Sequence, residues 1–268
     1  MVQPLVALQV FAVATTPKTK IADEVFVELQ KQILSGRYTS GDRLPPEREL
    51  AQTLDTNRNT LREAMRRLEQ ARLVTVRQGQ GVTVADFRHT GTIELLEPFL
   101  MVGEDTGEKL RALTDLLAAR SWVLEYALGL AARRADVSDI NKLSDIRRLL
   151  MTAYAAEDRS TLAAGFQHWM SALVDAAHSL PTRWVANPFL ELNRSFMEKF
   201  PTLWVLDESF PRYLLETEKA ISSGDAERAR KANRQYYERV DARINELLRQ
   251  VFVHLGPQGG PPITPDES

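Results

Sequence analysis

The first third of the chain shows short amphipathic segments separated by turn residues. In residues 21–35 the apolar side chains recur broadly at helical spacing, and Gly36 stands where a glycine commonly ends a helix. Pro46 is well placed to begin a second helix, which we expect over residues 47–54. A third helical pattern covers residues 57–71. The pattern therefore predicts three short helices in succession.

Two alternating runs follow these helices, at residues 73–76 and 82–84. Both are rich in β-branched side chains, and the glycine-bearing segment RQGQG separates them, so we expect a β-hairpin. Three short helices and a terminal hairpin within about 70 residues form a winged helix-turn-helix, which is a variant of a DNA-reading motif.

The remaining sequence is different in character. Residues 93–253 are rich in Leu and Ala, carry few glycines and show no strand pattern, which predicts six or seven packed helices. The fold class we expect is mainly α: an N-terminal winged helix-turn-helix and a C-terminal all-α bundle. The expected division is 1–17 disordered extension, 18–86 DNA-binding domain, 87–92 linker, 93–254 helical effector-binding and dimerisation domain, and 255–268 disordered tail.

The two terminal segments do not change this division. The first twenty residues contain an apolar run, but no positive charge precedes it and Pro4 interrupts its start, so we do not expect a secretory signal. The Gly- and Pro-rich segment GPQGGPPITPDES is typical of a disordered tail. Nowhere do 18 consecutive apolar residues occur, so no transmembrane helix is expected.

Composition limits the possible partners. The chain has 34 Lys and Arg against 36 Asp and Glu, so any contact with nucleic acid must come from a local basic patch. There are no cysteines, which excludes disulfides and thiolate metal sites and suits a reducing compartment. We therefore expect a cytoplasmic protein.

The third predicted helix carries such a patch. At about 100° per residue, Leu61 and Leu68 share one face, whereas Asn59, Arg62 and Arg66 lie opposite. One interpretation is a solvated helix face, with the arginines paired to Glu63 or Glu69. The other is DNA reading, because this is the second helix of a helix-turn-helix and arginine and asparagine can bind guanine and adenine edges bidentately.

The segment RLPPERELAQTLDTNRNTLREAMRRLEQARLVTVRQGQGVTV resembles the signature of the GntR family of transcription regulators. In its FadR branch, the resemblance implies DNA contacts from Arg48, Arg58 and Arg62, and minor-groove contacts from the wing tip at Gln78 and Gly79. Glutamine replaces a histidine there, but it too can hydrogen-bond to minor-groove acceptors.

Thr60 lies at the start of the same helix, where a short hydroxyl suits a phosphate contact. A capping or packing role is an equal alternative.

FadR-branch regulators have an all-helical domain that binds a small molecule and mediates dimerisation, and many hold a metal with one Asp and three His. In this sequence the aligned positions carry other residues: Ala163, Gln167, Leu214 and Tyr236. We therefore expect no metal and no other cofactor. The fatty acid regulators share this loss and bind long-chain acyl-CoA, which makes an acyl-CoA or a similar effector the expectation for this chain.

The candidate effector-binding residues are Arg120, Tyr236 and Trp169. Arg120 would hold a carboxylate or phosphate, although an ion pair with Glu125 or Asp115 is the alternative. Tyr237 and Val240 replace small residues of the fatty acid regulators, which questions the fit of the CoA portion. Several aromatic side chains either line a pocket or form ordinary core: Trp122, Phe166, Trp169, Trp184, Phe189 and Phe196.

Together these features predict a homodimeric, ligand-responsive regulator that binds a palindromic operator in double-stranded DNA. A regulator that senses a small organic acid is the nearest alternative. An enzyme built on the helical bundle is a weaker one, because the sequence offers no phosphate-binding loop and no nucleophile with an evident base.

Overall fold

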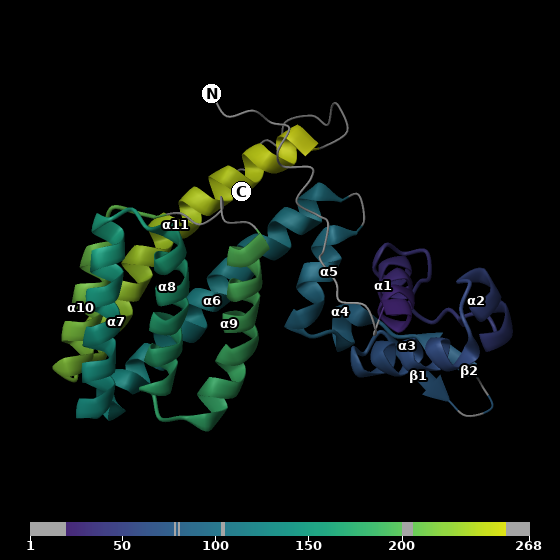
Figure 1. Ribbon diagram of the computed structural model, residues 1–268, viewed down its shortest axis with the longest axis horizontal. Coiled ribbons are helices and arrows are strands. Elements are labelled where there is room, and N and C mark those ends of the chain that lie inside the picture. Colours follow the sequence, from purple (N-terminus) through teal and green to yellow (C-terminus); the bar gives the residue numbers. More distant parts are fainter. Residues whose placement is uncertain (1–19, 78, 80, 103–104, 200–205, 256–268) are drawn as a thin grey trace, which may run out of the picture. The chain divides into compact units, whose positions relative to one another are not determined.

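The computed structural model describes residues 20–77, 79, 81–102, 105–199 and 206–255 (Figure 1). The chain forms two compact units, which divide between Asp105 and Thr106. Each unit has its own set of packed helices.

The first unit begins with three helices and a hairpin: α1 (Lys20–Leu34), α2 (Glu47–Thr53), α3 (Arg58–Gln70), β1 (Val74–Arg77) and β2 (Gly81–Val84). Gly36 has a φ of 82°, which favours glycine and suits the residue that follows a helix end. The strands pair antiparallel, with Val74 opposite Val84, and an isolated bridge joins Arg43 to Thr83. This is the predicted winged helix-turn-helix.

The core of this unit is formed where the three helices meet the hairpin. Leu29 of α1, together with Leu61 and Leu68 of α3, is fully buried, and Val74 and Val84 close the core from the hairpin. Burial of each such side chain contributes about 1.5–3 kcal/mol. The apolar stripe of α3 therefore fixes that helix in place and leaves its polar face outward.

Three short elements complete the first unit: α4 (Phe87–Thr90), the 3-10 helix η1 (Ile93–Leu95) and α5 (Leu96–Met101). Leu95 and Val102 are buried in the same core, and the rings of Phe87 and Phe99 lie 6.5 Å apart. The segment at residues 93–101, which the sequence assigns to the helical domain, thus packs on α1 and belongs to the first unit.

The second unit consists of long helices: α6 (Thr106–Arg134), α7 (Val137–Ala155), α8 (Arg159–Asp175), α9 (Leu180–Lys199), α10 (Phe210–Ser222) and α11 (Ala226–Leu255). Helix α11 packs along α6, α7 packs against α8, and α10 lies against α11 (Figure 1). The predicted all-α bundle is confirmed.

Local capping explains where these helices begin and end. Asp136 and Asp139 form a reciprocal capping box at the start of α7, and the Asp158 side chain accepts a hydrogen bond from the Thr161 N–H at the start of α8. Gly224, with a φ of 74°, follows the end of α10. The Asp225 side chain then accepts a hydrogen bond from the backbone N–H of Arg228, three residues later, at 2.9 Å.

The interior of the second unit is aromatic. Trp169, Phe210 and Tyr236 are almost fully buried, alongside aliphatic side chains such as Leu128. Among the described residues, no helix has the length and apolar character needed to cross a bilayer.

Candidate nucleic-acid interface and effector cavity

Helix α3 presents one apolar and one basic face, as its sequence predicts. Leu61, Ala64, Met65 and Leu68 are buried, whereas Asn59, Arg62 and Arg66 on the opposite face are exposed: Arg62 exposes 56% of its side chain and Arg66 exposes 71%. The polar face is therefore exposed to solvent and can contact the bases in a groove of DNA.

The N-terminus of α3 is fixed by Asn57. Its side-chain oxygen accepts a hydrogen bond from the Thr60 backbone N–H at 2.9 Å. The cap is thus Asn57, and Thr60 supplies only the donor, so the alternative that Thr60 itself caps the helix is wrong. Its phosphate contact stays a prediction.

Two further arginines flank this helix. Arg48 on α2 and Arg58 at the start of α3 are exposed and form no ion pair with any residue that the structure describes. Both guanidinium groups are therefore available to an anion. At the wing tip, Gly79 is exposed with a φ of 77°, while Gln78 lies outside the described residues. The DNA-contacting roles of these residues stay predictions.

The recognition-helix arginines have carboxylate partners. Arg66 donates to Glu63, one turn earlier, at 3.0 Å, as the local alternative predicts. Arg62 instead donates from Nε to Oε2 of Glu47, on α2, at 3.0 Å. Glu69 accepts a hydrogen bond from the Val76 N–H of the hairpin at 3.3 Å and forms no ion pair with either of these two arginines. Helical spacing could not reveal Glu47, because it lies 15 residues before Arg62.

The second unit contains an apolar cavity of about 80 Å³ between α6, α9 and α11. Two polar side chains border it, Arg120 of α6 and Asn193 of α9. The other lining residues are Leu113, Leu116, Leu117, Phe189, Leu192, Phe196, Met197, Ile244 and Leu248. This combination of one cation, one amide and many apolar groups is typical of a small-molecule site.

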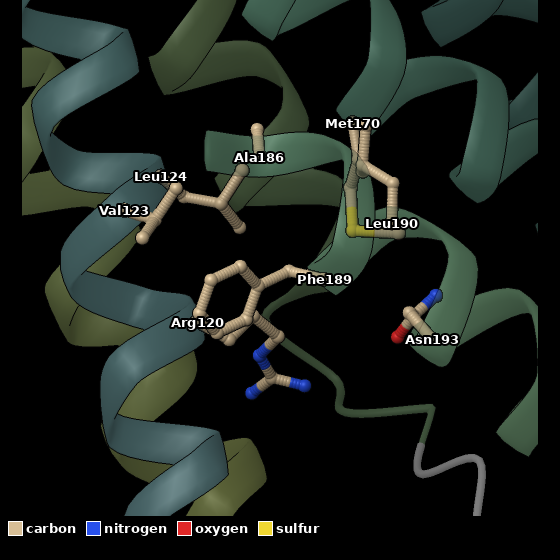
Figure 2. Close-up of a pocket in the computed structure, with 8 residues that line it drawn as sticks. All are labelled: Arg120, Val123, Leu124, Met170, Ala186, Phe189, Leu190 and Asn193. Carbon is tan, nitrogen blue, oxygen red and sulfur yellow. The ribbon is translucent and has the colours of Figure 1, made fainter. Parts of the chain in front are cut away.

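A second, smaller cavity of about 10 Å³ shares Arg120, Phe189 and Asn193 with the first (Figure 2). Figure 2 shows the Arg120 guanidinium beside the Phe189 ring, with Val123 and Leu124 on the same helix as Arg120. Arg120 and Phe189 therefore line both spaces, so movement of either side chain would change both.

Arg120 is held by an ion pair within the unit. Its side chain is 12% exposed and pairs with Asp241 of α11, which is 17% exposed. The guanidinium lies over the Tyr237 ring at 4.3 Å, and its Nε has no hydrogen-bond partner among the described residues. Burial raises the pKa of Asp241, and Arg120 opposes this rise. The ion-pair alternative is thus observed, but with Asp241 as its partner.

The buried tyrosines lie next to this pair. Tyr213 stacks on Tyr236 at 4.2 Å, and the Tyr237 hydroxyl contacts the sulfur of Met170 at 3.7 Å. Burial raises the pKa of Tyr237 to about 12, although Arg120 opposes this rise, so the phenol stays neutral.

Trp169 and Tyr236 lie in this aromatic core. Trp169 is fully buried, and neither residue is among those that line the two cavities. The Trp169 indole lies close to the Tyr213 hydroxyl, but neither group completes a hydrogen bond with any described residue. Their effector-binding roles stay predictions, and Arg120 is the candidate that borders the cavities.

The other aromatic candidates separate into three groups. Phe189 and Phe196 line the larger cavity, and Phe166 belongs to the core. Trp122 and Trp184 are 69% and 64% exposed, so the expectation that each lines a pocket or fills the core is wrong for both. They lie on outward faces of α6 and α9, which helical periodicity in an apolar-rich segment did not distinguish from inward ones.

The four positions where the family holds its metal provide no ligand set. Gln167 donates to the Leu190 carbonyl and accepts from Asn193, while Leu214 and Tyr236 are buried with aromatic and aliphatic neighbours. Ala163 offers no side-chain ligand. The residues present therefore do not fit a metal at this site.

Elsewhere in the described chain, one trio of potential ligands comes together: Asp136, Asp139 and His178. Asp139 accepts from His178 at 2.6 Å, and both acids already serve the capping box of α7. The cap explains this cluster without a metal ion.

An N-terminal winged helix with a basic recognition face, joined to a helical bundle with a cation-bordered apolar cavity, defines a DNA-binding transcription regulator. Comparison with known proteins agrees with this class. Residues 21–84 match the family described as bacterial regulatory proteins, gntR family. The chain is also 30% identical to the Uxu operon transcriptional regulator of Escherichia coli over 84% of this chain and 86% of that protein. The chain belongs to the GntR family, in its FadR-like branch.

Other similarities fit this assignment. The HTH-type transcriptional regulator Mce2R of Mycobacterium tuberculosis is 29% identical over 88% of this chain and 97% of its own. The fatty acid metabolism regulator protein of Vibrio cholerae is 29% identical, over 45% of this chain and 44% of its own. The solved structure of Lar, from Listeria monocytogenes, superposes with a TM-score of 0.52 over 87% of this chain and all of its own, at 16% identity, and so supports the fold alone.

Proposed function

We propose that this protein is a cytoplasmic, homodimeric regulator whose operator affinity changes when its helical unit binds an amphipathic acid. The observation that carries this proposal is the apolar cavity bordered by Arg120 and Asn193. No step of the proposed function requires catalysis, a metal or another cofactor.

The DNA-reading half of the proposal assigns base contacts to Arg58, Asn59, Arg62 and Arg66, which lie on the exposed side of α3. Arginine binds guanine O6 and N7, and asparagine binds adenine N6 and N7, each in a bidentate manner. Gln78 and Gly79 of the wing are assigned to the minor groove.

Arg48 and Thr60 are assigned to phosphates. A phosphate contact sets the position and orientation of the helix on the duplex but carries no sequence information, so it differs in kind from the base contacts.

The small contact area of a single winged helix on DNA favours a homodimer. A single such module buries about 600–1,000 Å² on DNA, whereas two half-sites related by a dyad double the contacts and give the affinity typical of specific operators. Exposed apolar side chains on the second unit are available for an interface between two copies: Trp122 and Tyr126 on α6, and Leu180, Trp184 and Val185 on α9. Aromatic side chains are enriched at such interfaces relative to the rest of a protein surface.

The effector assignment rests on the chemistry of the cavity. The buried guanidinium of Arg120 suits a carboxylate or phosphate, and its Nε, which has no partner in the part of the chain that the structure describes, can form an additional hydrogen bond. The leucine, isoleucine and phenylalanine side chains around the cavity suit an acyl chain. Partial similarity to a fatty acid metabolism regulator supports the same class of ligand.

The size of the cavity favours a second candidate. A volume of about 80 Å³ is well below the roughly 300–1,000 Å³ of typical ligand pockets. A long acyl chain therefore requires the cavity to enlarge, whereas a small organic acid requires less movement.

The experiment that separates these candidates is a titration of the preformed operator complex. Acyl-CoAs and free fatty acids of increasing length, and short hydroxy acids, would be added while operator binding is followed by fluorescence anisotropy. Each buried CH₂ contributes about 0.8 kcal/mol, so an acyl site gives an affinity that rises steeply with chain length until the cavity is full. A flat response, or a short acid that outperforms every lipid, supports the small-acid candidate.

Two matched variants locate the site. Arg120→Lys keeps the charge that faces Asp241 but loses the planar fork, so effector affinity should fall. Arg133→Lys, on the same helix but exposed, should leave it unchanged. Since coupling is reciprocal, operator DNA must weaken or strengthen effector binding by the same factor that the effector changes operator binding.

A further inference from the structure

One ion pair joins the two helices of the helix-turn-helix. Glu47 is the first residue of α2, and its Oε2 accepts a hydrogen bond from Nε of Arg62, in the second turn of α3, at 3.0 Å. The side chains are 42% and 56% exposed, respectively. The pair therefore lies on the polar side of α3, close to the residues assigned to DNA.

The stability of the fold does not explain this pair. An ion pair between side chains this exposed contributes little to folding, because water screens it and both side chains lose freedom. The buried apolar residues of α2, Leu50 and Ala51, already anchor that helix to the core. The main effect of Glu47 is therefore on the orientation of the Arg62 side chain.

The atom that Arg62 uses is informative. Its hydrogen bond to Glu47 comes from Nε, and no other described residue occupies the N–H groups of the two terminal nitrogens. These nitrogens form the fork that can bind O6 and N7 of one guanine. The carboxylate also carries a negative charge, which disfavours approach of a phosphate to the same guanidinium. Both effects favour a base edge over the DNA backbone.

We propose that Glu47 is a positioning residue that holds the Arg62 guanidinium in the orientation for base reading and thereby increases operator specificity. This inference rests on the proposed role of Arg62 in base contact. Arg66 differs, because its partner Glu63 lies on the same helix and exposes 51% of its side chain, so that pair follows α3 alone.

Without Glu47, we expect the protein to discriminate less between its operator and random duplex. Ordering one rotamer-rich side chain on binding lowers affinity by about 2- to 12-fold, which is the contribution that a preformed orientation removes. We therefore expect Glu47→Ala to lower operator affinity by about that factor per half-site. Affinity for random duplex should be unchanged or higher, since a negative charge has been removed. Glu47→Gln should lower operator affinity less than Glu47→Ala does, because the amide oxygen of glutamine can still accept a hydrogen bond from Nε of Arg62.

The test uses the full-length protein and two duplexes of equal length and composition. One is selected from a random-sequence pool by the wild-type protein, and the other is its scrambled version. Anisotropy titrations at several salt concentrations give both affinities and the salt slope, which counts phosphate contacts. On the selected operator this slope should not change if Glu47 acts on base reading. Glu49→Ala, an exposed acid on the same helix, is the matched control and should leave the specificity ratio unchanged.

A double-mutant cycle with Arg62→Ala completes the test. Support for the proposal requires that Glu47→Ala lower the specificity ratio in the wild-type background but not in the Arg62→Ala background. Equal losses on both duplexes with a lower melting temperature by circular dichroism would mean a structural role, and equal gains would mean simple charge screening. Either result would overturn the proposal. If Arg62→Ala itself has no effect on operator affinity, the base-contact assignment fails instead.

Discussion

Replacement of Arg120 by alanine should destabilise the helical unit and leave a carboxylate buried without its partner. Arg120 is 12% exposed, Asp241 is 17% exposed, and the guanidinium also covers the Tyr237 ring at 4.3 Å. Removal of one member of a buried ion pair typically costs about 3–5 kcal/mol, and a cation–π contact contributes about 0.5–2 kcal/mol. Because both side chains keep some contact with water, we expect a loss near the lower limit, about 3 kcal/mol at pH 7.

The stability loss of Arg120→Ala should depend on pH in a defined direction. The pKa of Asp241 is raised by burial, and Arg120 is the group that opposes the rise. Without Arg120 the folded-state pKa rises further above its ordinary value of 3.8, so the native state binds more protons than the unfolded state in that interval. Stability of Arg120→Ala relative to wild type should therefore recover as the pH falls from 7 through the raised pKa. Asp241→Asn in the same background should recover about 1.5 kcal/mol at pH 7, because it removes the buried charge.

Urea denaturation followed by tryptophan fluorescence is the appropriate assay. All four tryptophans of the chain lie after residue 106, so the signal reports the helical unit alone. Arg133→Ala, which removes an exposed arginine from the same helix, is the control and should change the midpoint little. The reasoning is refuted if Arg120→Ala and Arg120→Ala/Asp241→Asn are equally stable, or if the loss is the same at pH 5 and pH 7.

Three further outcomes are expected. Arg62→Ala should lower operator affinity by about 5- to 150-fold per half-site, the equivalent of one bidentate base contact, without a change in melting temperature; a change below about threefold in anisotropy would contradict the contact. Elemental analysis should find no stoichiometric zinc, nickel or manganese, and EDTA should not alter melting, since no metal would contribute to folding; one tightly held ion per chain would count against this. Asp158→Ala should destabilise the helical unit at pH 7, because the carboxylate caps α8 and hydrogen bonds from Thr161 lower its pKa below 3.8. Its stabilising effect is present above that value and lost as the pH falls through the lowered folded pKa, so equal urea midpoint differences at pH 7 and pH 3 would disagree with the assignment.

The elements of the first unit could be predicted from sequence because their signals are local. The side chain of Asn57 caps α3 by accepting a hydrogen bond from the N–H of Thr60, three residues later. Gly36 has the positive φ that its position after α1 requires. The basic face of α3 followed from the helical period alone. Each of these features depends on residues a few positions apart, which a periodic pattern can report.

The features that sequence did not predict depend on contacts between distant residues. Glu47 meets Arg62 across 15 positions, and Asp241 meets Arg120 across 121. In both cases the pattern indicated a nearby acid as the partner, because only the tertiary fold determines which carboxylate faces the guanidinium. The exposure of Trp122 has a similar cause, since periodicity in an apolar-rich helix does not show which face is covered by a neighbouring helix.

The ion pair between Arg120 and Asp241 also determines what an acidic effector must displace. If the effector binds at Arg120 as proposed, its anionic group competes with Asp241 for one guanidinium, and any weakening of that pair strengthens the tendency of Asp241 to take up a proton. Effector binding would then be accompanied by proton uptake and become tighter at lower pH. Acidity and effector concentration would thus act on the same bond between α6 and α11.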